Sequence, residues 1–131
     1  MIGLDTNVLA RFFLQDDRLQ SPKADTIMNS LTVEDPGWVG VATILELVWV
    51  LESKNRFKRK TITMTLNQLL RREEIVIEQP ECVQGALLLF RKGKADFADC
   101  LIAVSARAAG CNRTMTFDRT AARDAGMQLV G

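Results

Sequence analysis

Short apolar segments that alternate with helical segments constrain the fold of this chain more than any other feature. Strand character occurs at residues 1–4, 38–41, 75–78 and 113–116, and a last edge strand is expected at 127–130. Each of the first four segments is followed by residues whose spacing or capping pattern predicts a helix. The alternation predicts a single α/β domain over residues 1–131, with three α/β/α layers around a mainly parallel sheet of four or five short strands.

Capping residues predict where several helices begin. Thr6 and Asn7 offer capping side chains after the first strand, and Ser21 is expected to cap a helix that has Pro22 at its first position and ends near residue 31. Thr43 stands three residues before Glu46, which is the spacing of a capping box. Further helices are expected at residues 61–72, from Pro80 through Phe90, at 96–109 with Gly110 as the stop, and at 120–125.

Composition narrows the chemistry. The 131 residues are 47% hydrophobic and 25% charged, with a formal net charge of +1, which is typical of one globular domain and does not by itself indicate a nucleic-acid partner. Histidine and tyrosine are absent. The sequence therefore excludes histidine-based nucleases, Ser-His-Asp and Cys-His nucleophiles, and zinc bound through histidine.

Cysteine use and hydropathy indicate the compartment. The three cysteines, Cys82, Cys100 and Cys111, are an odd number without CxxC spacing, so we expect reduced thiols. The N-terminal residues lack the pattern of a signal peptide, and no run of about 18 apolar residues occurs. We expect a cytoplasmic protein without a membrane partner.

Acids next to apolar segments are the main functional signal. Asp96 and Asp99 fall in the first turn of a predicted helix, where the helix dipole alone could explain one of them, while Asp5, Glu46 and Asp118 adjoin or lie within apolar runs. Helix capping is the competing explanation for Asp5 and Glu46. Because a carboxylate near a core is costly without a partner, acids from four segments predict a shared cation.

A basic run follows the Glu46 segment. Either it forms a solvated face or it guides a phosphate backbone, with Phe57 as the only aromatic available for stacking there. The next helix, at residues 61–72, has apolar positions suited to core or dimer packing. The residues of this tentative RNA-binding run are Lys54, Arg56, Lys58, Arg59 and Lys60.

Four motifs in order along the whole chain resemble a PIN domain, and most closely the VapC-like toxins of bacterial toxin–antitoxin pairs. They are Asp5-Thr6-Asn7 after the first strand, Glu46 within a helix, the stretch from Asp96 to Ala103 with its Asp-x-x-Asp-x-Leu-Ile-Ala pattern, and Thr116-Phe117-Asp118 after a later strand. Each motif is weak alone, whereas four in this order are fairly specific.

The resemblance implies an endoribonuclease that uses Mg²⁺ or Mn²⁺, cuts single-stranded or loop RNA, forms a homodimer and is inhibited by a cognate antitoxin. It implies Asp5 and Asp99 as central metal ligands, Glu46 and Asp118 as completing acids, and Asp96 as an auxiliary acid. Thr6, Asn7 and Thr116 resemble the polar residues that orient these carboxylates. Attack by water on the phosphate would leave 5′-phosphate and 3′-hydroxyl ends.

Several further functions stay open at this level. A phosphatase or phosphotransferase with Asp5 as nucleophile usually has a second acid two positions later, where this chain has Asn7, and a phosphate-receiving switch domain needs a late lysine that is missing after Lys94. A non-catalytic binding domain is also compatible with these acids. So is a PIN-like nuclease that acts in housekeeping RNA processing.

Overall fold

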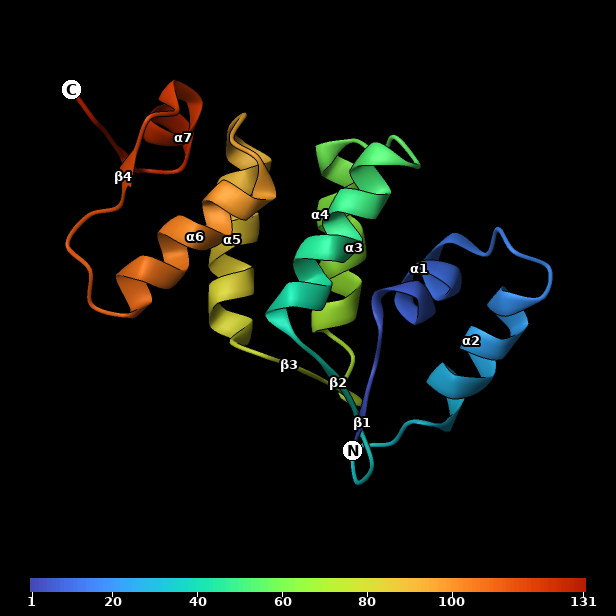
Figure 1. Cartoon of the computed structure of the whole chain (residues 1–131). Coiled ribbons are helices and arrows are strands. Elements are labelled where there is room, and N and C mark those ends of the chain that lie inside the picture. The colour runs from blue at the N-terminus through green and yellow to red at the C-terminus, as the bar shows by residue number, and fades with distance from the viewer. The chain divides into compact units, whose positions relative to one another are not determined.

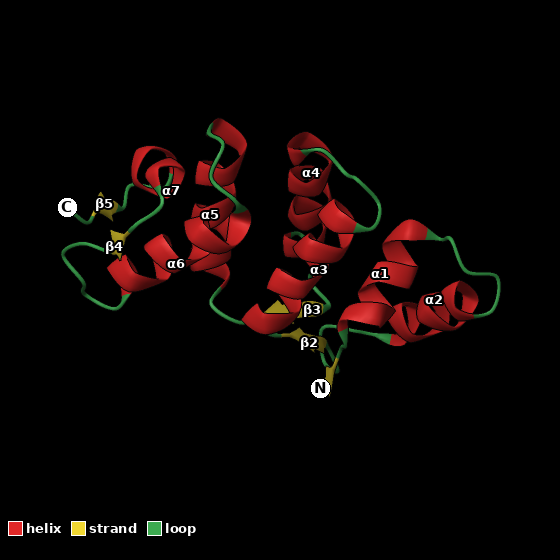
Figure 2. Ribbon diagram, turned by 45° about the horizontal axis from the view of Figure 1, so that its top comes forward, coloured by secondary structure: helices red, strands yellow, loops and turns green.

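The computed structural model describes residues 1–131 and divides into two compact units, Met1–Glu78 and Gln79–Gly131, called here the first unit and the second unit. Figure 1 labels their elements along the chain, and Figure 2 shows that helices make up most of the ribbon and that the strands are short. All strand pairings are parallel, in agreement with the predicted α/β class. The five strands form two sheets, three strands in the first unit and two in the second.

The first unit contains a parallel sheet in the order β1-β2-β3 and four helices. Register pairs Ile2 with Gly37 and Val39 with Ile77. Its elements are β1 (Ile2–Gly3), α1 (Thr6–Leu14), α2 (Gln20–Ser30), β2 (Gly37–Val39), α3 (Val41–Ser53), α4 (Arg59–Leu70) and β3 (Ile75–Ile77).

The second unit contains three helices and one strand pair, in which Met115 pairs with Gln128 and Thr116 with Leu129. Helices α5 and α6 pack against each other, and the rings of Phe90 and Phe97 meet edge to face with centroids 5.8 Å apart. Its elements are α5 (Pro80–Lys92), α6 (Phe97–Ala108), β4 (Met115–Thr116), α7 (Arg119–Asp124) and β5 (Gln128–Leu129).

Helical spacing determines which side chains of α4 are in the core. Ile62, Leu66 and Leu69 are fully buried, and Met64 is the exposed large apolar residue of this helix. Of the two alternatives predicted for the apolar positions of residues 61–72, core or dimer packing, the structure shows core packing for these three residues.

Three predicted helix starts are wrong, because side chains other than the expected caps bind the free amides. Helix α1 is capped by Asp5, and Thr6 and Asn7 lie inside the helix. Helix α2 starts at Gln20, where the carboxylate of Asp17 accepts hydrogen bonds from the amides of Leu19 and Gln20, at 3.0 and 2.7 Å. The hydroxyl of Ser21 donates instead to the Arg11 carbonyl.

Helix α3 begins at Val41 after Gly40, so Thr43 is not a cap and no capping box joins it to Glu46. The carboxylate of Glu78, at the end of β3, accepts a hydrogen bond from the Val41 amide at 2.8 Å. A residue 37 positions away in sequence therefore satisfies the start of this helix.

Predictions for the second unit agree with the structure. Pro80 opens α5, Gly93 ends it, Asp96 caps α6, and the left-handed Gly110 with φ of 97° follows that helix. The three cysteines are free, as expected: Cys82 and Cys100 are buried and Cys111 is exposed.

Candidate functional site

The acids of the first unit lie at the start of helix α1 and within helix α3. Asp5 follows β1 in an extended conformation, and its Oδ1 accepts a hydrogen bond from the Thr6 amide at 2.8 Å. Thr6 is 3% exposed, and its hydroxyl donates to Oε1 of Glu46. One neutral residue therefore contacts both acids of this unit, and it fixes Glu46 against the first turn of α1.

Glu46 lies on the exposed face of α3, contrary to the expectation of a buried position. Ala42, Glu46, Trp49 and Ser53 are all exposed, and they recur at intervals of four, three and four residues along the helix. This is one helical face, while Ile44, Leu47, Val48 and Leu51 are buried on the opposite face. The apolar neighbours in sequence point away from Glu46, so burial is not the reason for its presence.

Asn7 is exposed, and no hydrogen bond joins its side chain to Asp5 or Glu46. It lines a small groove between α1 and α2 together with Val8, Ala24 and Ile27. The groove has a volume of about 210 Å³ and a mainly apolar lining.

The acids of the second unit gather at two helix starts. Asp96 caps α6, and its Oδ1 accepts a hydrogen bond from the Asp99 amide at 2.8 Å. Asp118 caps α7, and its Oδ1 accepts from the amides of Thr120 and Ala121, at 2.8 and 3.0 Å. The Thr116 hydroxyl accepts from the Asp118 amide at 3.0 Å, so β4 and α7 together hold the Asp118 backbone.

Electrostatic repulsion is concentrated on Asp99. This residue is half-buried, and burial raises the pKa of its carboxyl above the ordinary value of 3.8. The negative charges of Asp96 and Asp118 raise the pKa of Asp99 further, as does a hydrogen bond with Asp96. The structure therefore brings Asp96, Asp99 and Asp118 close enough to interact.

None of the five predicted acids pairs with a lysine or arginine of its own unit. The ion pairs within the two units involve Asp35, Asp16, Glu74 and Asp124 instead. Carboxylates without cationic partners suit a hard divalent cation such as Mg²⁺ or Mn²⁺, which prefers oxygen ligands. No three acid or cysteine side chains are placed so that they could hold an ion together as they stand. The predicted acids therefore fit a divalent cation by the type of donor atom that they carry, and not by a formed coordination sphere.

The predicted basic run joins α3 to α4. Lys54, Arg56, Lys58 and Lys60 are exposed, while Arg59 and Phe57 are half-buried. The aromatic residue that sequence reasoning missed here is Trp49, which is 57% exposed and lies with its ring centroid 5.8 Å from Nζ of Lys54. Trp49 follows Glu46 by three residues, so the two side chains lie on the same face of α3. This spacing is the signal that would have identified it.

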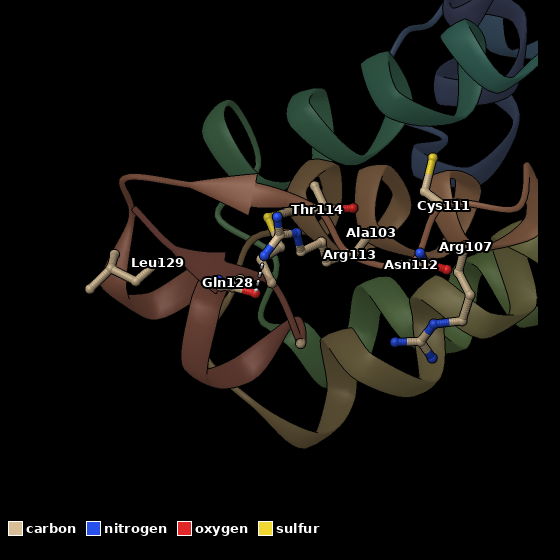
Figure 3. Close-up of a pocket in the computed structure, with 10 residues that line it drawn as sticks. Ala103, Arg107, Cys111, Asn112, Arg113, Thr114, Gln128 and Leu129 are labelled. Carbon is tan, nitrogen blue, oxygen red and sulfur yellow. Dashed lines mark hydrogen bonds between the residues drawn. The ribbon is translucent and has the colours of Figure 1, made fainter. Parts of the chain in front are cut away.

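A polar cavity in the second unit was also missed. It has a volume of about 460 Å³, and Figure 3 shows Arg107, Arg113, Asn112 and Gln128 around it. None of the predicted acids lines it. The cavity forms where the end of α6, the segment before β4 and the start of β5 meet, so no single stretch of sequence indicates it.

The chain belongs to the PIN domain family, whose model it matches over residues 2–126. It is similar to a VapC ribonuclease from Aquifex aeolicus (strain VF5), with 28% identity over 120 residues that cover 88% of this chain and 86% of that protein. These similarities support a nuclease role. No helix has both the length and the apolar character needed to span a bilayer.

Proposed function

We propose that this protein is a metal-dependent endoribonuclease that hydrolyses single-stranded or loop RNA and is the toxin of a toxin–antitoxin pair. The observation that carries this is the group formed by Asp96, Asp99 and Asp118, three acids that lack cationic partners in their unit. Burial raises the pKa of Asp99, and the charges of Asp96 and Asp118 raise it further. Membership of the PIN family and similarity to a VapC ribonuclease support the nuclease chemistry.

We propose Asp5 and Asp99 as the central metal ligands, Glu46 and Asp118 as the acids that complete the catalytic set, and Asp96 as an auxiliary acid. Thr6, Asn7 and Thr116 are proposed as the orienting polar residues, and the hydrogen bonds of Thr6 and Thr116 described above support that role for these two.

When bound, Mg²⁺ or Mn²⁺ would supply a Lewis acid that stabilises negative charge on the phosphate and lowers the pKa of a coordinated water. The task of the chain is to hold the carboxylates in fixed positions. Thr6 does so for Glu46 by donating a hydrogen bond from its hydroxyl to the carboxylate, and the capping amides of α7 do so for Asp118.

The products follow from the nucleophile. A protein without histidine has no imidazole to activate the ribose 2′-hydroxyl. We propose that water attacks the phosphorus and that the 3′-oxygen leaves, which gives 5′-phosphate and 3′-hydroxyl ends and no cyclic phosphate.

Substrate and partners complete the proposal. The exposed cations Lys54, Arg56, Lys58 and Lys60, with Arg59 beside them, would contact RNA phosphates, and Trp49 would stack on a base. The protein would work in the cytoplasm as a homodimer, and a cognate antitoxin would inhibit it.

The test uses purified protein, a mixed single-stranded RNA and Mn²⁺, with Asp99→Asn as the variant. We expect cleavage by the wild type that EDTA abolishes, 5′-phosphate ends on the products, and a loss of activity of roughly a hundredfold or more in the variant. Glu73→Gln, which neutralises an exposed acid that is not a predicted site residue, is the control and should remain active. Equal activity of wild type and Asp99→Asn would refute the catalytic assignment.

A further inference from the structure

The polar cavity of the second unit has walls that carry positive charge and no negative charge. Its lining includes Arg107 from the last turn of α6 and Arg113 from the segment before β4, and no aspartate or glutamate. Neither arginine takes part in an ion pair. Two uncompensated guanidinium groups therefore face one hollow, which favours an anionic ligand.

The two guanidinium groups reach neighbouring parts of the chain: Arg107 lies beside Gly126, between α7 and β5, and Arg113 contacts Gln128, the first residue of β5. Nη1 of Arg113 lies 3.5 Å from Oε1 of Gln128. Nη2 of Arg107 lies 3.8 Å from where a Cβ on Gly126 would stand. Gly126 has φ of 74°, a left-handed conformation that favours glycine, and the missing side chain leaves space beside Arg107.

The rest of the lining suits a nucleoside better than a bare inorganic ion. Asn112 and Gln128 carry amide groups that both donate and accept hydrogen bonds, as the edges of nucleobases require. Met127 and Leu129 add apolar surface. A volume of about 460 Å³ lies within the range of roughly 300–1,000 Å³ that is usual for small-molecule sites.

The cavity is separate from the acids of its own unit. Arg107 follows Asp99 by eight residues on α6, which places the two about 12 Å apart along the helix axis at about 1.5 Å per residue. At about 3.4 Å per stacked nucleotide, this separation corresponds to roughly three or four nucleotides. A strand that is cut near Asp99 is therefore long enough to reach the cavity.

We infer that this cavity binds one nucleotide of the RNA substrate at a distance from the cleaved bond, with its phosphate at Arg107 and Arg113 and its base at Asn112 and Gln128. The identity of the ligand as RNA rests on the proposed function. The shared chemistry is that of a nucleoside 5′-phosphate, which a strand or a free nucleotide could supply.

The experiment measures binding without cleavage. A fluorescent 12-nucleotide single-stranded RNA is titrated with wild-type protein in EDTA, at several salt concentrations, and unlabelled nucleoside 5′-monophosphates are used as competitors. The variant is Arg107→Gln with Arg113→Gln. The control is Arg71→Gln with Arg91→Gln, which removes two exposed arginines outside the cavity that form no ion pair.

We expect the cavity variant to bind the RNA about tenfold more weakly than wild type, and the slope of log K against log salt to fall by about 0.7, because the contact with one phosphate on a single strand is lost. The control should lose much less affinity. Arg107→Lys with Arg113→Lys, which keeps the charge, should restore most of the binding. Competition by monophosphates would show that the cavity binds a free nucleotide. Competition by RNA alone would show that it binds a nucleotide within an RNA strand. Either result supports the nucleotide site.

Equal RNA affinity of wild type and cavity variant, together with no binding of monophosphates, would overturn the inference, as would equally strong competition by an acidic peptide. These readouts are independent of catalysis. If wild-type protein fails to cleave RNA with Mn²⁺, the proposed function fails while nucleotide binding is still measured. If it cleaves, the cavity variant should raise KM about tenfold and leave kcat unchanged, unlike Asp99→Asn.

Discussion

In the first unit the two predicted acids are held by neutral donors, whereas the three acids of the second unit lie close enough to repel one another. Thr6 donates its hydroxyl to Glu46 and its amide to Asp5. Burial instead raises the pKa of Asp99, and the charges of Asp96 and Asp118 raise it further. The first unit can thus fix its acids without a counter-ion, while the second unit gains most from a bound cation.

The largest effect is expected at Asp118, which combines a charge with a cap. Asp118→Asn keeps an oxygen that can accept from the amides of Thr120 and Ala121, and should preserve stability while lowering RNA cleavage by roughly a hundredfold or more. Asp118→Ala should lose the same activity and also about 1 kcal/mol of unfolding free energy. Kinetic assays and urea titrations check both; equal stability of the two variants would show that the cap is unimportant.

In the first unit, removing the neutral donor should have the next largest effect. Thr6→Val leaves the Glu46 carboxylate without its hydroxyl partner, and we expect a loss of activity of about 10- to 100-fold, as for residues that orient metal ligands in general. Thr6→Ser keeps the hydroxyl and should retain most of the activity. If Val and Ser variants were equally active, the Thr6–Glu46 hydrogen bond would have no part in the chemistry.

The first unit also carries the exposed aromatic beside the basic run. Trp49→Leu should weaken binding of single-stranded RNA by about tenfold, because stacking on one base contributes roughly 1–3 kcal/mol. Trp49→Phe keeps a ring and should lose less. Fluorescence anisotropy in EDTA measures this, and unchanged affinity in the Leu variant would remove Trp49 from the RNA surface.

The smallest effect contrasts two aspartates of the second unit. The raised pKa of Asp99 means that stability falls as pH rises from 3.8 through that pKa, so Asp99→Asn should raise Tm by no more than a few degrees near pH 7 and lose this gain in acid. Arg123 and the Lys94 amide lower the pKa of Asp124, so Asp124→Asn should lower Tm near pH 7, with the difference vanishing as pH falls below 3.8. Shifts of the same sign in metal-free buffer would contradict the electrostatic contrast.

Local signals were sufficient where a segment supplies its own caps. The start of α5 at Pro80, the cap of α6 at Asp96 and the left-handed Gly110 could be predicted because all three signals lie within or next to the helices that they delimit. The start of α3 could not, because Glu78 binds the Val41 amide from the far end of the unit's chain. When a distant residue binds the free amide at a helix start, the sequence around that start carries no capping pattern.

The acids show the same division. The grouping of Asp96 and Asp99 follows from their spacing on one helix, and Asp118 joins them through the position of α7 after β4. The expected burial of Glu46 was wrong because its apolar neighbours in sequence lie on the opposite face of helix α3. The cavity could not be predicted from the sequence, because Arg107 and Arg113 meet the Gly126–Gln128 segment only once β4 and β5 pair.

The central claim is that the predicted acids bind a divalent cation, and titration with Mn²⁺ followed by calorimetry tests it most directly. We expect wild-type protein to bind Mn²⁺, and Asp5→Asn and Asp99→Asn each to bind it at least tenfold more weakly, since each removes a charged ligand. Unchanged Mn²⁺ affinity in either variant would contradict the proposed ligand role of that residue.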